Sequence, residues 1–226
     1  MEKTEGALIR ANLKSGCRVL VFAKEPETGQ VKTRLIPLLG AAGAVALHQQ
    51  LVKHALATAL DAKIGEVELC CAPSFEHPFF GRCAEEFGIT LRSQGPGDLG
   101  QRMFHAFQKS LCHSERVLLI GSDCPALTSR DLRHAAEKLK TGNDVLLGPT
   151  EDGGYVLIGL TRCSPRLFQG ITWGGSHVME QTRERLHKLK WRWYELPMLW
   201  DVDRPDDYRR LAHLPGWEEL RGAKTG

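Results

Sequence analysis

Short apolar runs alternate with longer segments of helical character along the chain. Runs rich in branched residues, which are typical of buried strands, occupy residues 18–23, 67–72, 89–92, 117–121, 144–148, 155–160 and 192–196. Helices are expected at residues 41–60, within 75–87, and at 99–111, 128–139, 176–189 and 205–214. Because strands that alternate with helices form mainly parallel sheets covered on both faces, we expect an α/β fold.

Local signals mark the beginnings of two of these helices. Thr128 is a candidate N-cap with Asp131 three residues later, and Pro205 occupies a first helical position with acidic residues in the next turn. The strands at 144–148 and 155–160 lie on either side of a Gly-Gly turn. No internal repeat, low-complexity block or linker interrupts the alternation, so one continuous domain is expected.

Length, composition and charge exclude several classes of protein. With 226 residues, 42% of them hydrophobic and 25% charged, the chain can form a sizeable core and differs from disordered proteins. Its net charge of +3 comes from scattered basic residues, so no nucleic-acid partner is expected. The most apolar runs are shorter than the roughly 20 residues that cross a bilayer, and residues 1–16 lack the apolar core of a secretory signal. We therefore expect a cytoplasmic protein without a membrane segment.

The seven cysteines show no metal-binding or redox pattern, because none are paired at the two-residue separation of zinc knuckles. Most lie in or beside apolar segments, so reduced and buried thiols are expected. Cys124 lies near candidate chemistry, where a packing role is favoured over contact with a substrate. The exposed helix faces contain no heptad seam that would indicate a particular oligomer.

The loop after the first predicted strand carries three cations. Lys24, Lys32 and Arg34, with Gly29 between them, could converge with backbone N–H groups on phosphate oxygens. The loop lacks the Gly-Lys-Ser/Thr of a Walker loop and the three glycines of the dinucleotide fingerprint. Taken alone, it is explained equally well as a nucleotide phosphate site or as a charged surface loop.

An aspartate follows the predicted strand at 117–121 within Gly121-Ser122-Asp123-Cys124-Pro125. The carboxylate of Asp123 is therefore expected at the carboxyl edge of the sheet, where it could hold a divalent cation that bridges diphosphate oxygens. A turn or helix cap is the alternative role for such an aspartate. Because Thr128 already supplies a cap, metal ligation is the favoured interpretation.

Two later motifs also contain paired carboxylates. In Glu151-Asp152-Gly153-Gly154-Tyr155 the acidic residues either form a tight hairpin turn or place Asp152 to orient or deprotonate an acceptor hydroxyl, and both interpretations stay open. Asp201 and Asp203 would point to the same side of an extended segment, as a second pair of metal-facing carboxylates would. The following Asp206 and Asp207 are expected to cap a helix.

Two glycine-containing loops complete the candidate chemistry. In the stretch from Gln94 to Met103, glycines could bring backbone close to a base or ribose, and Arg102 could reach a phosphate. Trp173 and the following Gly-Gly-Ser could line an acceptor pocket, although core packing by Trp173 and helix capping by Ser176 explain them as well. Neither signal is specific alone.

Together the motifs resemble one family when taken in order. They are Lys24…Gly29…Lys32-Thr33-Arg34-Leu35, Gly97-Asp98-Leu99-Gly100-Gln101-Arg102, Gly121-Ser122-Asp123-Cys124-Pro125, Glu151-Asp152-Gly153-Gly154-Tyr155 and Asp201-Val202-Asp203. The set resembles the bacterial glycosyltransferase-like family known as radical-SAM/selenodomain-associated transferases, some members of which are linked to arsenosugar biosynthesis. It is more distantly similar to molybdenum-cofactor and 2-phospholactate guanylyltransferases. The resemblance covers about residues 19–211, which leaves residues 1–17 as an N-terminal extension and 18–226 as a single transferase domain.

The resemblance implies the GT-A (Rossmann-like) fold of the nucleotide-diphospho-sugar transferases, a mixed, mainly parallel sheet flanked by helices on both faces. It implies a nucleotide-binding set of Ala23, Lys24, Gly29, Lys32, Thr33, Arg34, Gln94, Gly97 and Arg102. It implies an acceptor or sugar pocket at Glu151, Gly153, Gly154, Tyr155 and Trp173. Finally, it implies a Mg²⁺ or Mn²⁺ ion on Asp123, assisted by Asp201 or Asp203.

The leading hypothesis is a metal-dependent glycosyltransferase that moves a sugar from a nucleotide-sugar to a small-molecule acceptor. In this reaction the metal and Lys32 would stabilise the leaving diphosphate, and Asp152 would position or deprotonate the acceptor. Gly121 occupies the position of the first carboxylate of the Asp-x-Asp glycosyltransferase motif, which leaves a nucleotidyltransferase open as the alternative. That enzyme would join a nucleoside triphosphate to a phosphorylated acceptor and release pyrophosphate. A non-catalytic nucleotide-binding module is the third hypothesis.

Overall fold

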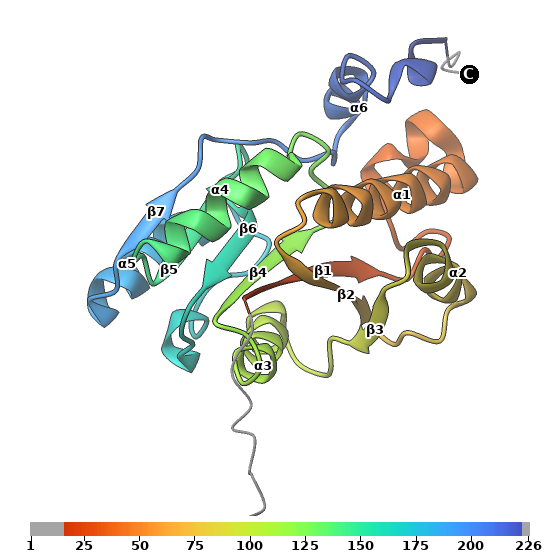
Figure 1. Ribbon diagram of the computed structural model, residues 1–226. Coiled ribbons are helices and arrows are strands. Elements are labelled where there is room, and N and C mark those ends of the chain that lie inside the picture. The colour runs from red at the N-terminus through yellow and green to blue at the C-terminus, as the bar shows by residue number, and fades with distance from the viewer. Residues whose placement is uncertain (1–15, 223–226) are drawn as a thin grey trace, which may run out of the picture.

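The computed structural model describes residues 16–222, which form a twisted sheet between two layers of helices (Figure 1). The sheet contains, within that range, seven strands in the order β3-β2-β1-β4-β6-β5-β7. All are parallel except β6, which is antiparallel to both of its neighbours. The strands are β1 (Cys17–Lys24), β2 (Gly65–Ala72), β3 (Thr90–Ser93), β4 (Arg116–Gly121), β5 (Val145–Pro149), β6 (Tyr155–Leu160) and β7 (Trp193–Glu195). The expected mixed, mainly parallel α/β fold is confirmed.

Helices cover both faces of the sheet (Figure 1). One face packs against α1 (Ile36–Asp61), α2 (Pro78–Phe87) and α4 (Ser129–Lys140). The opposite face packs against α3 (Leu99–Ser110) and α5 (Val178–Leu189). A shorter helix, α6 (Pro205–Leu211), packs on α1 in a third cluster that contains Trp200 and Tyr208.

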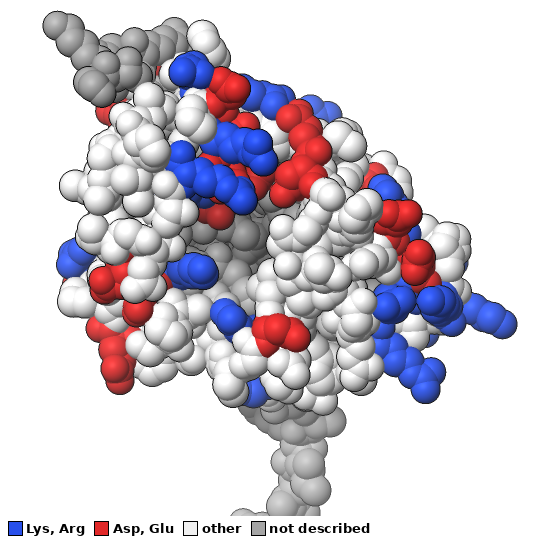
Figure 2. All heavy atoms as spheres, turned by 180° about the vertical axis from the view of Figure 1, so that it is seen from behind, with Lys and Arg blue, Asp and Glu red and all other residues white. Residues whose placement is uncertain are grey.

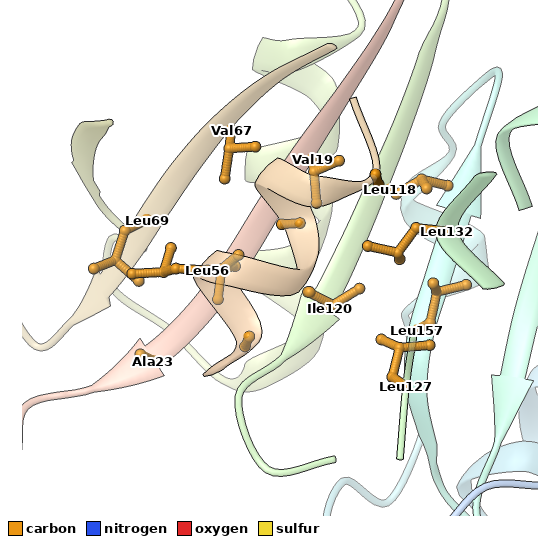
Figure 3. Packing of buried hydrophobic residues seen from close by; sticks show 14 of the residues in the cluster. Val19, Ala23, Leu56, Val67, Leu69, Leu118, Ile120, Leu127, Leu132 and Leu157 are labelled. Atoms are coloured by element: carbon orange, nitrogen blue, oxygen red, sulfur yellow. The ribbon is translucent and has the colours of Figure 1, made fainter. Parts of the chain in front are cut away.

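The core follows the two-residue period of the strands. Val19 and Val21 of β1 point to the layer of α1, whereas Leu20 and Phe22 point to the layer of α3. Figure 3 shows the first of these layers, where Leu56 of α1 lies over the strands. Since both faces of each central strand are buried, the strands appear in the sequence as continuous apolar runs.

The helix ends agree with the sequence in most places. Thr128 and Asp131 form a reciprocal capping box at the start of α4, and Asp98 forms one with Gln101 at the start of α3. Capping by Ser176, one of the two interpretations of that residue, is wrong, because the N-cap of α5 is His177, which makes no side-chain capping bond. At the N-terminal boundary, β1 already begins at position 17, and residues 1–15 of the expected extension lie outside the described residues.

One stretch is longer and more apolar than the sequence analysis expected. Within residues 16–222, Thr33–Asp61 is the single helical segment whose length and mean hydropathy of 1.5 would suffice to cross a membrane. A helix that covers a sheet can have the same composition. Here the buried side chains of α1 pack on β1 and β2, and the helix bends at Gly40, where φ is 69°.

The strand order reverses between β1 and β4, which lie side by side and parallel. Both strands are followed by helices on the same face of the sheet, α1 after β1 and α4 after β4, but the chain then continues to β2 on one side of the pair and to β5 on the other. A crevice is expected outside the carboxyl ends of strands at such a reversal. Later in the chain, a segment crosses the same edge: Leu199 donates to Pro149 O at 2.8 Å, and Val202 donates to Asp123 O at 2.8 Å. The fold thereby brings the loops after β1 and β4 together with residues 199–203.

Candidate functional site

Four adjoining cavities lie along the carboxyl edge of the sheet. The first, which we call the glycine-loop pocket, has a volume of about 590 Å³. Its lining residues come from the loops after β1, β2 and β3 and from α3: Lys24, Glu25, Gln30, Ala72, Pro73, Ser93, Gly95, Pro96, Gly97 and Arg102. The Arg102 guanidinium is fixed at the rim because its Nε donates to Gly97 O at 2.8 Å. The pocket therefore offers a ligand both glycine backbone, at Gly95 and Gly97, and two cations, Lys24 and Arg102.

The second cavity, the strand-end pocket, lies directly outside β1 and β4 and has a volume of about 300 Å³. It shares Lys24, Gln30 and Arg102 with the glycine-loop pocket. Its further lining residues are Phe22, Ala23, Val31, Lys32, His48, Gln94, Leu99, Gly121, Ser122, Asp123 and Asp203.

An ion pair occupies the middle of the strand-end pocket. Lys32 Nζ lies 2.7 Å from Asp123 Oδ1 and also donates to Val202 O at 2.7 Å. The Lys32 side chain is only 5% exposed, whereas that of Asp123 is 46% exposed and faces the cavity. Burial would raise the pKa of Asp123, but the adjacent ammonium outweighs it and holds the pKa below its ordinary value. Asp123 is therefore a carboxylate at neutral pH.

The third cavity, the apolar slot, has a volume of about 220 Å³ and lies beside β4 and β6. Its wall is mainly aliphatic and aromatic, and no Lys or Arg lines it: Phe22, Leu99, Met103, Leu119, Gly121, Thr150, Asp152, Gly154, Tyr155, Val156, Ile158, Trp173, Gly174, Gly175, Val178 and Asp201. Trp173 can close one side because Gly100 of α3 lies beneath it, where a Cβ atom would be 2.5 Å from the indole Nε1.

The fourth cavity, the acidic pocket, has a volume of about 370 Å³. It shares Asp152, Asp201, Gly174 and Gly175 with the apolar slot, and its other lining residues are Arg34, Glu151, Ser176, Trp200, Asp203, Arg204 and Asp207. Its two arginine-carboxylate pairs involve residues far apart in the sequence. Arg34 pairs with Asp203, and Arg210 binds both oxygens of Glu151 at 3.0 and 2.9 Å.

Asp152 and Asp201 lie where the slot and the acidic pocket meet. Burial, then the negative charge of Asp152, and then that of Asp123 raise the pKa of Asp201 to about 6. Asp152 Oδ1 accepts from Thr150 Oγ1 at 2.6 Å and from Gly154 N at 3.0 Å, which fixes the side chain. Gly153 lets this turn pack on the loop before α5, because a Cβ atom there would lie 2.0 Å from Ser176 O.

Shared lining residues join the four cavities into one track. Leu99 and Gly121 belong to both the strand-end pocket and the apolar slot, and Asp203 belongs to both the strand-end and acidic pockets. The first two cavities contain Lys24, Lys32 and Arg102, whereas the apolar slot contains no cation and the acidic pocket contains five carboxylates beside Arg34 and Arg204. Figure 2 shows a hollowed face of the molecule with basic and acidic side chains next to one another around its rim. This distribution of charge suits an anionic ligand in the first two cavities and a second ligand beside it in the other two.

The carboxylates fit a divalent cation that a bound phosphate completes. Among residues 16–222, no three His, Cys, Asp or Glu side chains are close enough to form a complete metal site. Magnesium is usually held by one or two carboxylates together with water and substrate phosphates, and Asp123 and Asp201 supply such a pair. Burial and the charge of Asp152 raise the pKa of Asp201 most, and Asp123 adds a smaller repulsion that a bound cation would relieve. Asp203 lines the acidic pocket with Asp201 and the strand-end pocket with Asp123, and its carboxylate is paired with Arg34.

The structure brings most of the predicted nucleotide-binding residues together and separates others. Lys24, Ala23, Lys32, Gln94, Gly97 and Arg102 line the first two cavities. The amide of Gln94 donates to Ala23 O at 3.2 Å and Cys70 O at 2.9 Å, so it also joins the ends of β1 and β2. Arg34 lies in the acidic pocket, and Gly29 and Thr33 line none of the four cavities.

The predicted acceptor or sugar residues divide between the last two cavities. Gly154, Tyr155 and Trp173 line the apolar slot, Glu151 lines the acidic pocket, and Gly153 lines neither. The sequence analysis missed several lining residues: Phe22, Gln30, His48, Ser93, Leu99 and Met103. Phe22 and Met103 follow the same apolar period as the core, so no sequence signal distinguishes them.

Comparison with known proteins places the chain in a family. Residues 55–175 match the family described as "Uncharacterized protein conserved in bacteria (DUF2064)". The chain belongs to this family. The chain also resembles a solved structure from Desulfovibrio desulfuricans G20, named as a nucleotide-diphospho-sugar transferase, with 30% identity and a TM-score of 0.80. That similarity covers 91% of this chain and 94% of the other. The search of curated proteins gives no match.

More distant structures share the fold with this DUF2064 protein. The 4-diphosphocytidyl-2C-methyl-D-erythritol synthase of Anaerococcus prevotii DSM 20548 is 10% identical with a TM-score of 0.56, covering 84% of this chain and 94% of the other. Glucosyl-3-phosphoglycerate synthase of Mycobacterium tuberculosis, solved with Mn²⁺ and UDP, is 11% identical with a TM-score of 0.53, covering 86% and 75%. These two distant structures confirm the predicted fold. The predicted transferase class is supported by the name of the 30% identical structure.

Proposed function

We propose that this DUF2064 protein is a metal-dependent glycosyltransferase that moves a sugar from a nucleotide-sugar to an uncharged small-molecule acceptor. The observation that carries the proposal is the polarity of the track. Lys24, Lys32 and Arg102 line the two cavities at one end, whereas Asp152 and Asp201 stand at the other, beside a slot without any cation. An anionic donor suits the first end, and an acceptor without phosphate suits the second.

The donor would occupy the glycine-loop and strand-end pockets. The exposed backbone of Gly95 and Gly97 suits the flat base and ribose, and the cavity of about 590 Å³ has room for a nucleoside. Lys24 and Arg102, which line both cavities, would neutralise the diphosphate. The diphosphate would then reach Asp123, where a metal can share its oxygens.

A divalent ion, Mg²⁺ or Mn²⁺, would be held by Asp123 and Asp201 and would supply charge neutralisation to the leaving diphosphate. Lys32 would contribute a fixed positive charge at the same place, because its buried ammonium already stands beside Asp123. The bond between the anomeric carbon and the phosphate oxygen breaks, and its electron pair stays on the nucleoside diphosphate. The acceptor oxygen forms the new bond to that carbon.

Asp152 would receive the proton of the acceptor hydroxyl. Its Oδ1 is held by Thr150 and Gly154, and no residue in the described part of the chain donates to its Oδ2. Because Oδ1 is fixed, the direction of Oδ2 is fixed as well. A carboxylate held in this way is suited to general base catalysis. This assignment accounts for the location of Asp152 between the apolar slot and the acidic pocket.

Nucleotidyl transfer is the second candidate function. Two cations of the loop after β1, Lys24 and Lys32, line the strand-end pocket, and Gly121 stands where a first carboxylate would be; both features suit a triphosphate. A phosphorylated acceptor, however, would approach Asp152 and Asp201 without a lining Lys or Arg in the apolar slot. This repulsion makes glycosyl transfer the better fit. The resemblance to radical-SAM-associated transferases stays a prediction. It would bear on the pathway that produces the acceptor.

The experiment that tests the proposal is a thermal-shift panel of nucleotide-sugars and nucleoside triphosphates with Mg²⁺, Mn²⁺ or EDTA. A ligand that binds only the native state raises the unfolding midpoint by mass action. Metal-dependent stabilisation by one nucleotide-sugar, lost in Asp123→Asn, is expected. Asp206→Asn is the matched control, because that carboxylate is 91% exposed and pairs only with its helix neighbour Arg209. Stabilisation by a triphosphate alone would favour nucleotidyl transfer, and no stabilisation by any of these compounds would favour a non-catalytic module.

A further inference from the structure

We propose that the apolar slot binds the body of the acceptor, and that this acceptor is an uncharged alcohol with an apolar group about the size of one ring. The inference rests on the proposed glycosyl transfer and goes beyond it, because it names the class of the second substrate. Its support comes from the composition, charge and volume of the slot and from one exposed apolar side chain at its mouth.

The composition of the slot suits an apolar group better than a sugar. Met103, Leu119 and Ile158 form the buried part of its wall, and Tyr155 and Trp173 add aromatic rings whose centroids lie 6.4 Å apart. Each sugar hydroxyl placed against Met103, Leu119 and Ile158 would lose water without gaining a partner from them, which costs about 1–3 kcal/mol. The hydroxyl-rich sugar of the donor fits the neighbouring acidic pocket, where Glu151, Ser176 and Asp207 supply polar groups.

Leu99 supports a ligand at this place independently. It is 40% exposed, and it is one of three large apolar side chains exposed among the described residues, the others being Phe75 and Met198. Leu99 is the first residue of α3, a position where helices favour acidic side chains over apolar ones. Folding therefore gives no reason for a leucine here. Leu99 lies on the boundary between the strand-end pocket and the slot, where a bound apolar group would cover it. Ligand binding therefore explains the leucine.

Charge and volume define the occupant further. The charged residues of the slot are two carboxylates, Asp152 and Asp201. With a metal held at Asp201, the charge of Asp152 would still repel a carboxylate or phosphate on the acceptor, and no Lys or Arg of the slot would offset it. An engineered apolar cavity of about 150 Å³ accommodates benzene, so a slot of about 220 Å³ has room for one substituted ring. An alcohol on that ring would reach Asp152 at the mouth, where the hydroxyl proton would be taken up.

The test uses benzyl alcohol as the probe, with benzoate as its anionic analogue and glycerol as its polar one. Binding to the full-length protein is followed by saturation-transfer NMR and by competition. We expect benzyl alcohol to bind about tenfold more tightly than benzoate or glycerol. Leu99→Asp should weaken benzyl alcohol binding by about tenfold, since it places a carboxylate in the apolar mouth. Because Leu99 is exposed at a helix start, this variant should fold normally.

Met198→Asp is the matched control, because Met198 is 65% exposed and lines none of the four cavities. It should bind benzyl alcohol as the unchanged protein does. Equal binding of benzoate, preference for glycerol, or equal loss in both variants would overturn the inference. Nucleotide-sugar binding is measured separately by the thermal shift. Nucleotide-sugar binding without probe binding overturns the inference alone, whereas probe binding without any nucleotide-sugar binding supports the slot and overturns the proposed function.

Discussion

Lys32 and Asp123 form an ion pair of 2.7 Å across the point where the strand order reverses. The Lys32 backbone is left-handed, with φ of 48°, a conformation that is uncommon for a residue with a side chain. Its ammonium also donates to Val202 O, so one side chain joins the loop after β1, the end of β4 and the segment before α6. The local backbone strain is therefore balanced by contacts that assemble the site.

We expect Lys32→Met to lower the turnover of a nucleotide-sugar by about 10²–10³-fold, the usual loss when one fixed electrostatic group is removed from a transition state. The reason is that the leaving diphosphate loses a buried positive charge that needs no reorganisation. Steady-state kinetics at saturating donor, with the unfolding midpoint recorded in parallel, separate this effect from unfolding. Lys53→Met is the control, because Lys53 pairs with Glu86 on the surface, and it should stay within about twofold. Equal rates for both variants would contradict the role of Lys32.

Asp152→Asn should reduce kcat by about 10²–10⁴-fold and leave donor binding unchanged, because the amide oxygen can still accept from Thr150 and Gly154 but cannot take up a proton. Donor affinity is measured by titration calorimetry and kcat by release of the nucleoside diphosphate. Asp206→Asn is the control, because this carboxylate is 91% exposed, pairs with Arg209 and lines none of the four cavities, and it should have little effect on kcat. A loss of donor affinity in Asp152→Asn would assign that residue to binding instead.

The sequence predicts the sheet well because the physical cause of each strand is local. A strand buried on both faces needs a continuous apolar run, and β1 and β4 show such runs directly. The capping box of Thr128 is equally local, since both partners lie within one helical turn. Such features depend on neighbours in the sequence, so their period and spacing are sufficient to find them.

The site was harder to predict where it depends on distant partners. The sequence places Arg34 in the same loop as Lys24 and Lys32, so it was grouped with them. In the structure Arg34 pairs with Asp203, 169 positions away, and therefore lines the acidic pocket. The apolar slot shows a different difficulty. Phe22 and Met103 line it, yet in the sequence they are indistinguishable from core residues, because a cavity is a gap in packing and leaves no mark on the hydrophobic period.

A buried histidine, His48, and a half-buried one, His54, should make the protein sensitive to acid. Burial lowers the pKa of His48, although its bond with Lys24 O at 2.9 Å opposes the shift, and burial likewise lowers the pKa of His54. Both pKa values lie below the unfolded value of about 6.5, so the unfolded chain takes up protons first as the pH falls. Their contribution to the free energy of unfolding is therefore complete above about pH 6.5 and is lost as the pH falls toward the folded pKa.

His48→Gln should flatten this pH dependence, because glutamine can donate to the same carbonyl and does not titrate. Urea unfolding at several values between pH 5 and pH 7 measures it. Asp201, with its pKa raised to about 6, changes stability in the opposite direction over part of this range, and it is present in both proteins, so the comparison isolates His48. Identical slopes for the two proteins would show that His48 is not the acid-sensitive group.

Gly100→Ala should destabilise the protein by about 1–3 kcal/mol, the usual cost of overpacking. The added Cβ atom would lie 2.5 Å from Trp173 Nε1 and 2.8 Å from two further indole atoms, so the ring must move away from α3. Gly81→Ala is the matched control within a helix, because a methyl group added there would have no neighbouring atom within 4 Å, and it should be neutral or stabilising by up to about 1 kcal/mol. Since Trp173 closes the apolar slot, Gly100→Ala should also weaken benzyl alcohol binding while Gly81→Ala leaves it unchanged. Unfolding free energies and probe binding, measured on the same two variants, therefore test whether the contact between α3 and Trp173 shapes the slot as well as the fold.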